Sequence, residues 1–223
     1  MSCEDFPKET EYKTKDVSIL VRTVSSEKKY FMTFQGFQTQ LLATGEELPY
    51  YMYNSLKDYN CIYVKDNSQI WYSLYYNSTL RFLRKILVEL GNPSVVCIGQ
   101  SAGGYAAILY GNLLRVKKVI SLSPQIEIFV SFLNPHRKKL IKKYNLKNYR
   151  FANLTTIQPF AVPTVIMVGD LNTHDKKSVD LLDKEDPNLT IQYIDTNSHN
   201  IIPTIGKKEL LEMIIKENHT LTH

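Results

Sequence analysis

The chain has 223 residues, of which 43% are hydrophobic and 22% charged, so it can bury a sizeable core and extensive disorder is excluded. Its net charge of +5 comes from scattered lysines and short basic runs, not from one long basic block. That distribution predicts a solvated surface, and we expect no nucleic-acid partner. The alternative is a patch that binds nucleic acid or an anionic surface.

The predicted elements alternate between strands and helices along the chain. Ser94–Ile98 is an apolar run of strand length, typical of a central parallel strand that is buried on both faces. Leucines spaced by three or four residues predict a helix over Ser73–Leu90, which Gly91 and Pro93 then end. In chain order we expect strands at Val17–Val24, Tyr30–Phe34, Asn60–Val64, Ser94–Ile98, Lys118–Leu122, Thr164–Val168 and Thr190–Ile194, and helices at Ser73–Leu90, Gly103–Leu114 and Lys207–Glu217.

This alternation predicts an α/β protein with a mostly parallel central sheet and helices on both faces of that sheet. We expect residues 1–223 to form a single domain. The short polar link Ser25–Lys29 predicts that the first two strands form an antiparallel hairpin. The long, partly basic stretch Ile126–Ala161 does not fit the alternation, and we expect it to be an insertion over the strand ends, in the form of a small helical cap.

The segment Gly99–Gly103 carries the clearest chemical signal, because it reads G-x-S-x-G between a buried strand and a helix. A nucleophile elbow needs that context: the serine sits on a sharp strand-to-helix turn, and small residues on either side leave room for the chain to cross. Ser101 is therefore the predicted nucleophile. The alternative is that the glycines serve only close packing of the helix against the strand.

A serine hydroxyl needs a base, and His199 has the expected place in the chain. It follows the last predicted strand and precedes the last helix, which agrees with the order serine, acid, histidine. Of the other histidines, His136 lies in the basic insertion and His174 in the loop of the acid, while the remaining two lie in the C-terminal tail. His199 is therefore the predicted general base.

The acid of the triad should follow the strand Thr164–Val168, where two candidates stand. Asp170 comes directly after the strand. The sequence favours Asp175, because the five-residue step from Asp170 lets the Asp175 carboxylate reach sideways to an imidazole. Each residue also has a structural alternative: Asp175 could be the N-cap of a helix that starts at Lys176, and Asp170 could stabilise a turn.

Two backbone N–H groups are expected to stabilise the oxyanion that forms beside Ser101. The first belongs to Ala102, at the N-terminus of the helix that follows the nucleophile. The second should come from Gly36 or Phe37, in the loop after the strand Tyr30–Phe34. In the structural alternative, Gly36 only turns the chain.

The cysteines and histidines argue against a disulfide framework and against a metal site. Cys3, Cys61 and Cys97 are widely spaced, and the last two lie in apolar runs, so we expect buried, reduced thiols there. No HExxH motif and no histidine–carboxylate cluster at ligand spacing is present, which predicts no metal. No secretory signal pattern and no apolar stretch of roughly 20 residues is visible, so we expect no membrane span and a cytoplasmic location.

These residues resemble the α/β-hydrolase superfamily from about Val17 to Glu217. More narrowly, Gly99–Ala107 and Ser121–Gln125 resemble small hydrolase-like proteins associated with bacterial surface-polysaccharide genes. Lys65-Asp66 followed by Trp71-Tyr72 is similar to that group as well, with a lysine in place of its usual arginine. The resemblance implies an α/β-hydrolase fold and a Ser-His-Asp triad that uses neither a metal nor an organic cofactor, and it names no substrate.

Three functions fit the sequence. The first is a serine hydrolase that cleaves an ester or thioester through an acyl-enzyme on Ser101, with His199 as base and Asp175 orienting it. The second is an acyltransferase that uses the same triad on a sugar or other hydroxyl acceptor. The third is a non-catalytic binding domain, against which the order of serine, acid and histidine argues. In the first two, the expected partner is a small-molecule or glycan-linked acyl ester.

Overall fold

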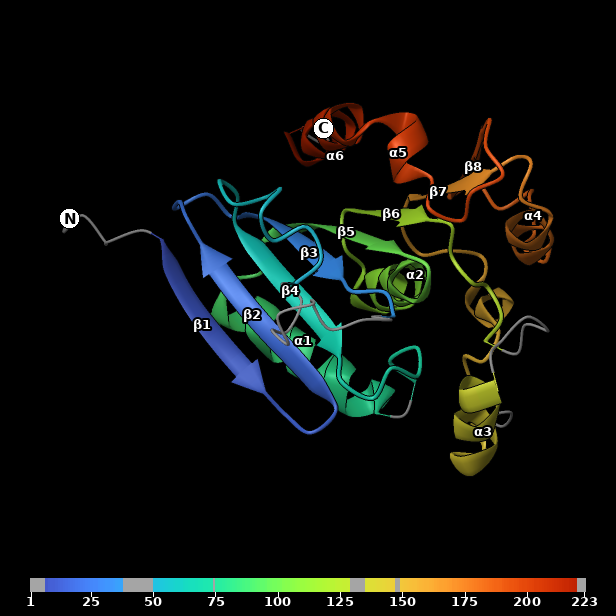
Figure 1. Ribbon diagram of the computed structural model, residues 1–223. Coiled ribbons are helices and arrows are strands. Elements are labelled where there is room, and N and C mark those ends of the chain that lie inside the picture. Colours follow the sequence, from blue (N-terminus) through green and yellow to red (C-terminus); the bar gives the residue numbers. More distant parts are fainter. Residues whose placement is uncertain (1–6, 38–49, 74, 129–134, 147–148, 220–223) are drawn as a thin grey trace, which may run out of the picture.

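The computed structural model describes residues 7–37, 50–73, 75–128, 135–146 and 149–219. In this part of the chain, eight strands form one sheet in the order β1-β2-β4-β3-β5-β6-β7-β8 (Figure 1). Neighbours from β4 to β8 in that order are parallel, while β2 is antiparallel to both β1 and β4. The strands are β1 Lys8–Lys13, β2 Val17–Thr23, β3 Lys29–Phe34, β4 Cys61–Asp66, β5 Ser94–Gln100, β6 Lys118–Leu122, β7 Thr164–Gly169 and β8 Leu189–Ile194.

Helices cover both faces of this sheet, as the alternation predicts. α1 (Tyr76–Glu89) and α2 (Ala102–Leu114) lie on one face, and α6 (Lys207–His219) lies on the other (Figure 1). No helix within the described ranges is long and apolar enough to cross a membrane. The remaining elements are short: α3 Pro135–Lys143, α4 Thr173–Val179, α5 Ile202–Ile205 and a 3₁₀ turn at Leu154–Ile157.

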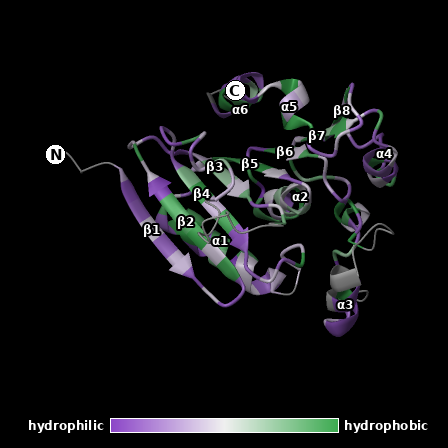
Figure 2. Cartoon of the chain, viewed as in Figure 1, coloured by the Kyte–Doolittle hydropathy of each residue, from purple (hydrophilic) through white to green (hydrophobic). Residues whose placement is uncertain are grey.

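The central strands are buried on both faces, and β5 illustrates the pattern. Val95 and Cys97 pack into the cluster that contains residues of α1 and α2, whereas Val96 and Ile98 pack into the cluster on the α6 side. Successive side chains of a strand point to opposite faces, so a continuous apolar run fills two cores at once. In Figure 2 the inner strands are accordingly more hydrophobic than β1.

The two described cysteines are buried and free, as the sequence predicts. Burial raises the pKa of the Cys61 thiol to about 12, and it also raises the pKa of the Cys97 thiol. Both thiols therefore stay protonated at neutral pH, which makes them poor nucleophiles. Cys3 lies outside the described residues.

The predicted hairpin of the first two strands is wrong, because β2 and β3 are not neighbours. β4 lies between them, antiparallel to β2 and parallel to β3. β3 is buried on both faces and pairs along both edges, which a hairpin at the start of the sheet would not allow. The polar link instead crosses the start of β4, where the Asn60 side-chain oxygen accepts from the N–H groups of Val24 and Ser25 at 2.7 and 3.1 Å.

β1, the actual hairpin partner of β2, was not predicted from the sequence. Four of its six residues are charged, and its side chains are largely exposed, so it has no apolar face for a pattern to reveal. It pairs with β2 over Lys8–Lys13, and a charged edge strand of this kind discourages pairing with another chain.

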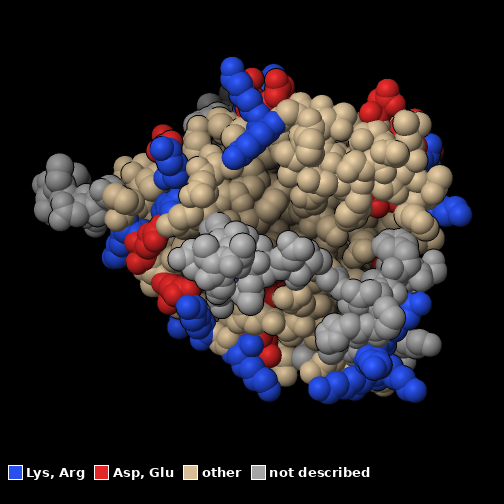
Figure 3. Space-filling model, in the orientation of Figure 1, with Lys and Arg blue, Asp and Glu red and all other residues tan. Residues whose placement is uncertain are grey.

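The stretch predicted to be an insertion, 126–161, contains α3 and the 3₁₀ turn, while residues 129–134 and 147–148 lie outside the described ranges. Glu127 and Asn153 form an isolated antiparallel bridge across its base. Lys and Arg side chains gather over α3 in Figure 3, where Lys138, Lys139, Lys142 and Lys143 are exposed. Its role as a cap over the strand ends stays a prediction.

Candidate active site

Ser101 lies on the sharp turn between β5 and α2, at φ 57° and ψ −121°. A non-glycine residue with positive φ is uncommon, and strain of this kind costs about 1–3 kcal/mol. The turn is held by the Ser101 N–H, which donates to Leu122 O at 2.9 Å, and by the Tyr105 N–H, which donates to Ser101 O at 3.0 Å. The backbone around the serine therefore has the geometry of a nucleophile elbow.

The glycines of the motif are required by the close crossing of the chain. A Cβ atom on Gly99 would collide with Gly103 O, and one on Gly103 would collide with Phe34 O. Both collisions are with backbone atoms, which cannot give way as a flexible side chain could. The small residues of G-x-S-x-G thus let the strand, the turn and the helix pass one another at the serine.

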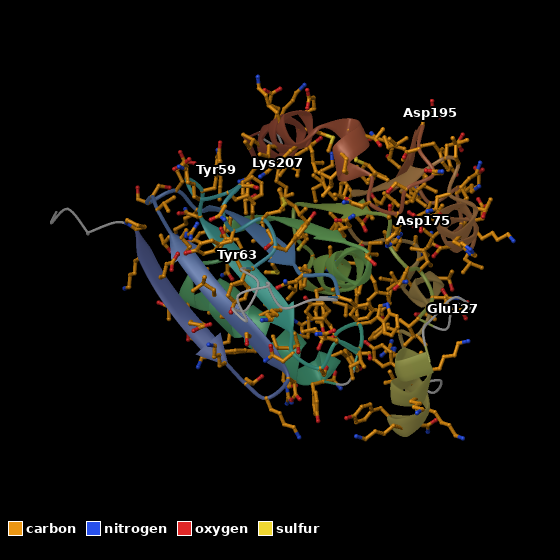
Figure 4. All side chains as sticks on the ribbon, viewed as in Figure 1. Tyr59, Tyr63, Glu127, Asp175, Asp195 and Lys207 are labelled. Atoms are coloured by element: carbon orange, nitrogen blue, oxygen red, sulfur yellow. The ribbon has the colours of Figure 1, made fainter. Side chains whose placement is uncertain are left out.

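His199 is bound by Asp175. The His199 Nδ1 atom lies 2.9 Å from one carboxylate oxygen of Asp175 and 3.0 Å from the other. A carboxylate accepts, so Nδ1 carries a ring proton, and in the neutral tautomer with that proton the Nε2 atom is the acceptor. The Asp175 side chain is only 4% exposed and the His199 side chain 41%, so the acid is enclosed while the ring reaches solvent. Figure 4 labels Asp175 where α4 approaches the strand ends.

The other candidates for acid and base lie elsewhere. The Asp170 carboxylate forms an ion pair with Lys176 at 2.8 Å and is 47% exposed. His174 is exposed on the first turn of α4. The alternative of Asp175 as an N-cap is also wrong, because α4 begins earlier than expected and Asn172 caps it by accepting from the N–H groups of His174 and Asp175.

Amide side chains connect the loop that carries His199 to the start of α4 and to the turn at Ser101. Asn172 Nδ2 donates to Asn197 O at 3.2 Å, which links the start of α4 to the loop that carries His199. Gln100 Nε2 donates to Asn200 Oδ1 at 3.0 Å, so the residue before Ser101 is bonded to the residue after His199. The sequence analysis did not single out these amides, since nothing in the local pattern marks a partner so distant in the chain.

The expected oxyanion donors lie next to the elbow. A Cβ atom on Gly36 would lie 2.9 Å from Gln100 O and 3.9 Å from Ser101 Cβ, so this glycine is in close contact with the turn. Ala102 is the first residue of α2, where backbone N–H groups have no partner within the helix. The Phe37 ring packs edge-to-face on Trp71, with 4.6 Å between the ring centroids.

A buried loop after β4 supports this side of the site. The Asp66 carboxylate accepts hydrogen bonds from the N–H groups of Ile70 and Tyr72, each at 2.8 Å, and from both the N–H and the hydroxyl of Ser68. Burial raises the pKa of Asp66, and these hydrogen bonds act in the opposite direction. Burial also raises the pKa of Tyr72 well above its ordinary value, so its hydroxyl stays protonated and can donate.

The same loop holds the indole ring of Trp71 close to the end of β6. Trp71 Nε1 donates to Gln125 Oε1 at 2.7 Å, just after β6, and both side chains are buried. Asp66, Trp71 and Tyr72 entered the sequence analysis only through the family resemblance. Their function in the site was missed, because most partners of Asp66 are backbone N–H groups that any sequence supplies.

The described residues contain no group of three or more His, Cys, Asp or Glu side chains placed to hold a metal ion. The groups that the site does offer are a serine hydroxyl, an imidazole–carboxylate pair and backbone N–H donors. The prediction that the protein uses no cofactor stays a prediction.

Comparisons with known proteins give similarity at the level of structure. No family model matches the sequence, and no curated protein matches it. A capsule O-acetyltransferase of Neisseria meningitidis serogroup A is similar with a TM-score of 0.71 and 19% identity, covering 96% of this chain and 97% of its own. An esterase of Pyrococcus furiosus has a TM-score of 0.62 and 12% identity, covering 95% of this chain and 90% of its own.

A thioesterase domain from the curacin biosynthetic pathway is also similar, with a TM-score of 0.53 and 13% identity, covering 95% of this chain and 100% of its own. Identities this low bear on the fold alone. Together with the sheet order and the turn at Ser101, they establish that this chain has the α/β-hydrolase fold.

Proposed function

We propose that this protein is a serine hydrolase that cleaves an ester or thioester through an acyl-enzyme on Ser101. One observation carries the proposal: His199 is held through Nδ1 by the buried Asp175, on a loop that is hydrogen-bonded to the residue before Ser101. A scaffold that only binds has no need of a strained serine, nor of a solvent-reaching imidazole that an enclosed acid holds.

In the proposed reaction, Ser101 Oγ attacks the acyl carbonyl carbon while His199 Nε2 takes the hydroxyl proton. The carbonyl electron pair moves to oxygen, which the N–H group of Ala102 and that of Gly36 or Phe37 stabilise. Collapse of this tetrahedral intermediate breaks the bond to the alcohol or thiol, which leaves with the proton from His199. Water then attacks the acyl-enzyme in the same way, releases the carboxylic acid and restores the Ser101 hydroxyl.

The second candidate is an acyltransferase, in which a sugar or other hydroxyl replaces water in the final step. It is favoured by the similarity to a capsule O-acetyltransferase, which extends over nearly the whole length of both chains. The substrate in either case would be a small-molecule or glycan-linked acyl ester. The two candidates share every residue of the site and differ only in whether water or a bound hydroxyl reaches the acyl-enzyme.

Labelling with a fluorophosphonate probe tests the proposed nucleophile. The intact protein should gain one probe mass on Ser101, Ser101→Ala should gain none, and Ser78→Ala, an exposed serine on α1, should label as the wild type does. A wild-type protein that stays unlabelled would instead support a binding domain without catalysis. With p-nitrophenyl acetate as donor, the yields of acetate and of acetylated oligosaccharide separate hydrolysis from transfer.

A further inference from the structure

The peptide group between Gln35 and Gly36 is held at its carbonyl oxygen, which lies opposite its N–H. The Tyr72 hydroxyl lies 2.9 Å from Gln35 O and 3.0 Å from Val64 O, and these two oxygens share its one proton. The peptide is trans, so its C=O and N–H point in opposite directions within one plane. A hydrogen bond that fixes Gln35 O therefore also fixes the direction of the Gly36 N–H.

That N–H lies beside the nucleophile and is available. The contact of Gly36 with Gln100 O leaves no room for a side chain, so the backbone of Gly36 itself faces the elbow. Among the residues that the structure describes, none accepts a hydrogen bond from the Gly36 N–H. A half-buried donor that has no acceptor among the described residues, next to a serine nucleophile, has the properties that an oxyanion donor requires.

The Tyr72 ring is in turn fixed by the loop that Asp66 organises. Tyr72 is 3% exposed and has a φ of 56°, while Trp71 before it has a φ of 59°. Two consecutive non-glycine residues at positive φ are costly and persist only where the surroundings enforce them. The N–H groups of Ile70 and Tyr72 donate to the Asp66 carboxylate, and these hydrogen bonds hold the loop in that conformation.

We infer that Asp66 and Tyr72 are positioning residues that direct the Gly36 N–H at the oxyanion, through the hydrogen bond from Tyr72 to Gln35 O. The inference rests on the proposed function, and it selects Gly36 over Phe37 as the second donor. Neither Asp66 nor Tyr72 touches the substrate. Their effect is transmitted through one peptide plane.

Loss of either positioning residue should weaken binding of the transition state and leave binding of the substrate unchanged. Negative charge develops on the carbonyl oxygen only as the tetrahedral intermediate forms, so a misdirected donor lowers kcat and leaves KM unchanged. Removing an oxyanion donor altogether costs about 10²–10³ in kcat. Because Tyr72→Phe leaves the donor present and frees only its direction, we expect a kcat loss of about 10-fold, below that range.

The experiment compares Tyr72→Phe with Tyr30→Phe, using p-nitrophenyl acetate turnover and inhibition by a simple alkyl boronic acid. Tyr30 lies near the start of β3, the strand whose far end leads to Gly36, and its buried hydroxyl is hydrogen-bonded to Thr23 at 3.0 Å. Both variants lose one such hydroxyl, so thermal unfolding should show similar destabilisation. Only Tyr72→Phe should lower kcat and weaken boronate binding, both by about 10-fold, because both depend on the same donor.

Equal kcat losses in the two variants, or a Tyr72→Phe effect on KM alone, would overturn the inference. Asp66→Asn should reproduce the kcat loss and unchanged KM of Tyr72→Phe, and an Asp66→Asn variant that folds with wild-type kcat would also overturn it. If Asp66→Asn fails to fold, Tyr72→Phe alone decides. The proposed function fails separately, when Ser101→Ala retains turnover.

Discussion

The two regions next to Ser101 differ in how their side chains are held in place: one contains Asp175 and His199, and the other contains Asp66 and Tyr72. On one side, Asp175 holds a His199 ring that is 41% exposed, and the loops are joined by amides at or near the surface. On the other side, Asp66 and Tyr72 are buried and bonded to backbone atoms. A general base that transfers protons between the serine, the leaving group and water must be accessible to solvent. An oxyanion donor only stabilises the charge that develops on the substrate oxygen, so it is most effective when its position is fixed.

The largest expected effect comes from removing the proton carrier. His199→Ala should lower turnover by roughly 10⁶, as the loss of a triad histidine does elsewhere, because the proposed reaction depends on this imidazole to take the proton of Ser101. The matched control is His174→Ala, an exposed histidine on α4, which should change turnover less than about 3-fold. Turnover of p-nitrophenyl acetate measures both, and the reverse ranking would require a different triad.

Next comes the acid of the same region. Asp175→Asn should lower turnover by about 10⁴, because an amide cannot hold the Nδ1–H tautomer as the carboxylate does. Asp170→Asn removes only an exposed ion pair with Lys176, worth about 0–1 kcal/mol, and should leave turnover near the wild-type value. A large loss in Asp170→Asn with an active Asp175→Asn would exclude Asp175 as the acid.

Substitutions at Asn172 can distinguish the positioning of His199 from the stability of α4. Its Oδ1 caps α4 and its Nδ2 holds Asn197 O, so Asn172→Asp keeps the cap and removes the link. We expect Asn172→Asp to unfold near the wild-type temperature and to lose roughly 2- to 10-fold in kcat, the equivalent of one ordinary hydrogen bond. Asn172→Ala should show the same kcat loss and also lose about 1 kcal/mol of stability with the cap. Wild-type kcat in both variants would show that the link does not position His199.

The smallest expected effect is that of a chelator. Neither side of Ser101 is proposed to use a metal, so dialysis against EDTA should leave kcat and KM unchanged. Lost turnover that zinc restores would contradict the proposed mechanism.

Local structure and the order of elements along the chain were enough to predict part of the candidate site. The turn at Ser101 is specified within Gly99–Gly103, because both the strain and the close crossing depend on neighbours in the chain. The order of the parallel strands brings Asp175 and His199 together beyond their ends, so their proximity followed from chain order.

The parts that sequence missed depend on distant partners. A five-residue link between β2 and β3 suits a hairpin, yet Asn60, more than thirty residues away, holds that link over β4. Asp66 and Asn172 act through backbone atoms, which have no signature of their own in a sequence. Local pattern therefore predicts elements and turns, while strand neighbours and buried polar networks depend on pairings that only the folded chain specifies.

The positive φ at Ser101 places thermal stability and catalytic activity in conflict at this position. Glycine adopts positive φ without steric cost, so Ser101→Gly would release part of the strain and make the protein harder to unfold. A laboratory selection that asks only for survival of heating would be free to discard the nucleophile, whereas one that asks for product must keep it. Thermostable variants of this protein should therefore be screened for labelling at position 101 before their melting temperatures are compared.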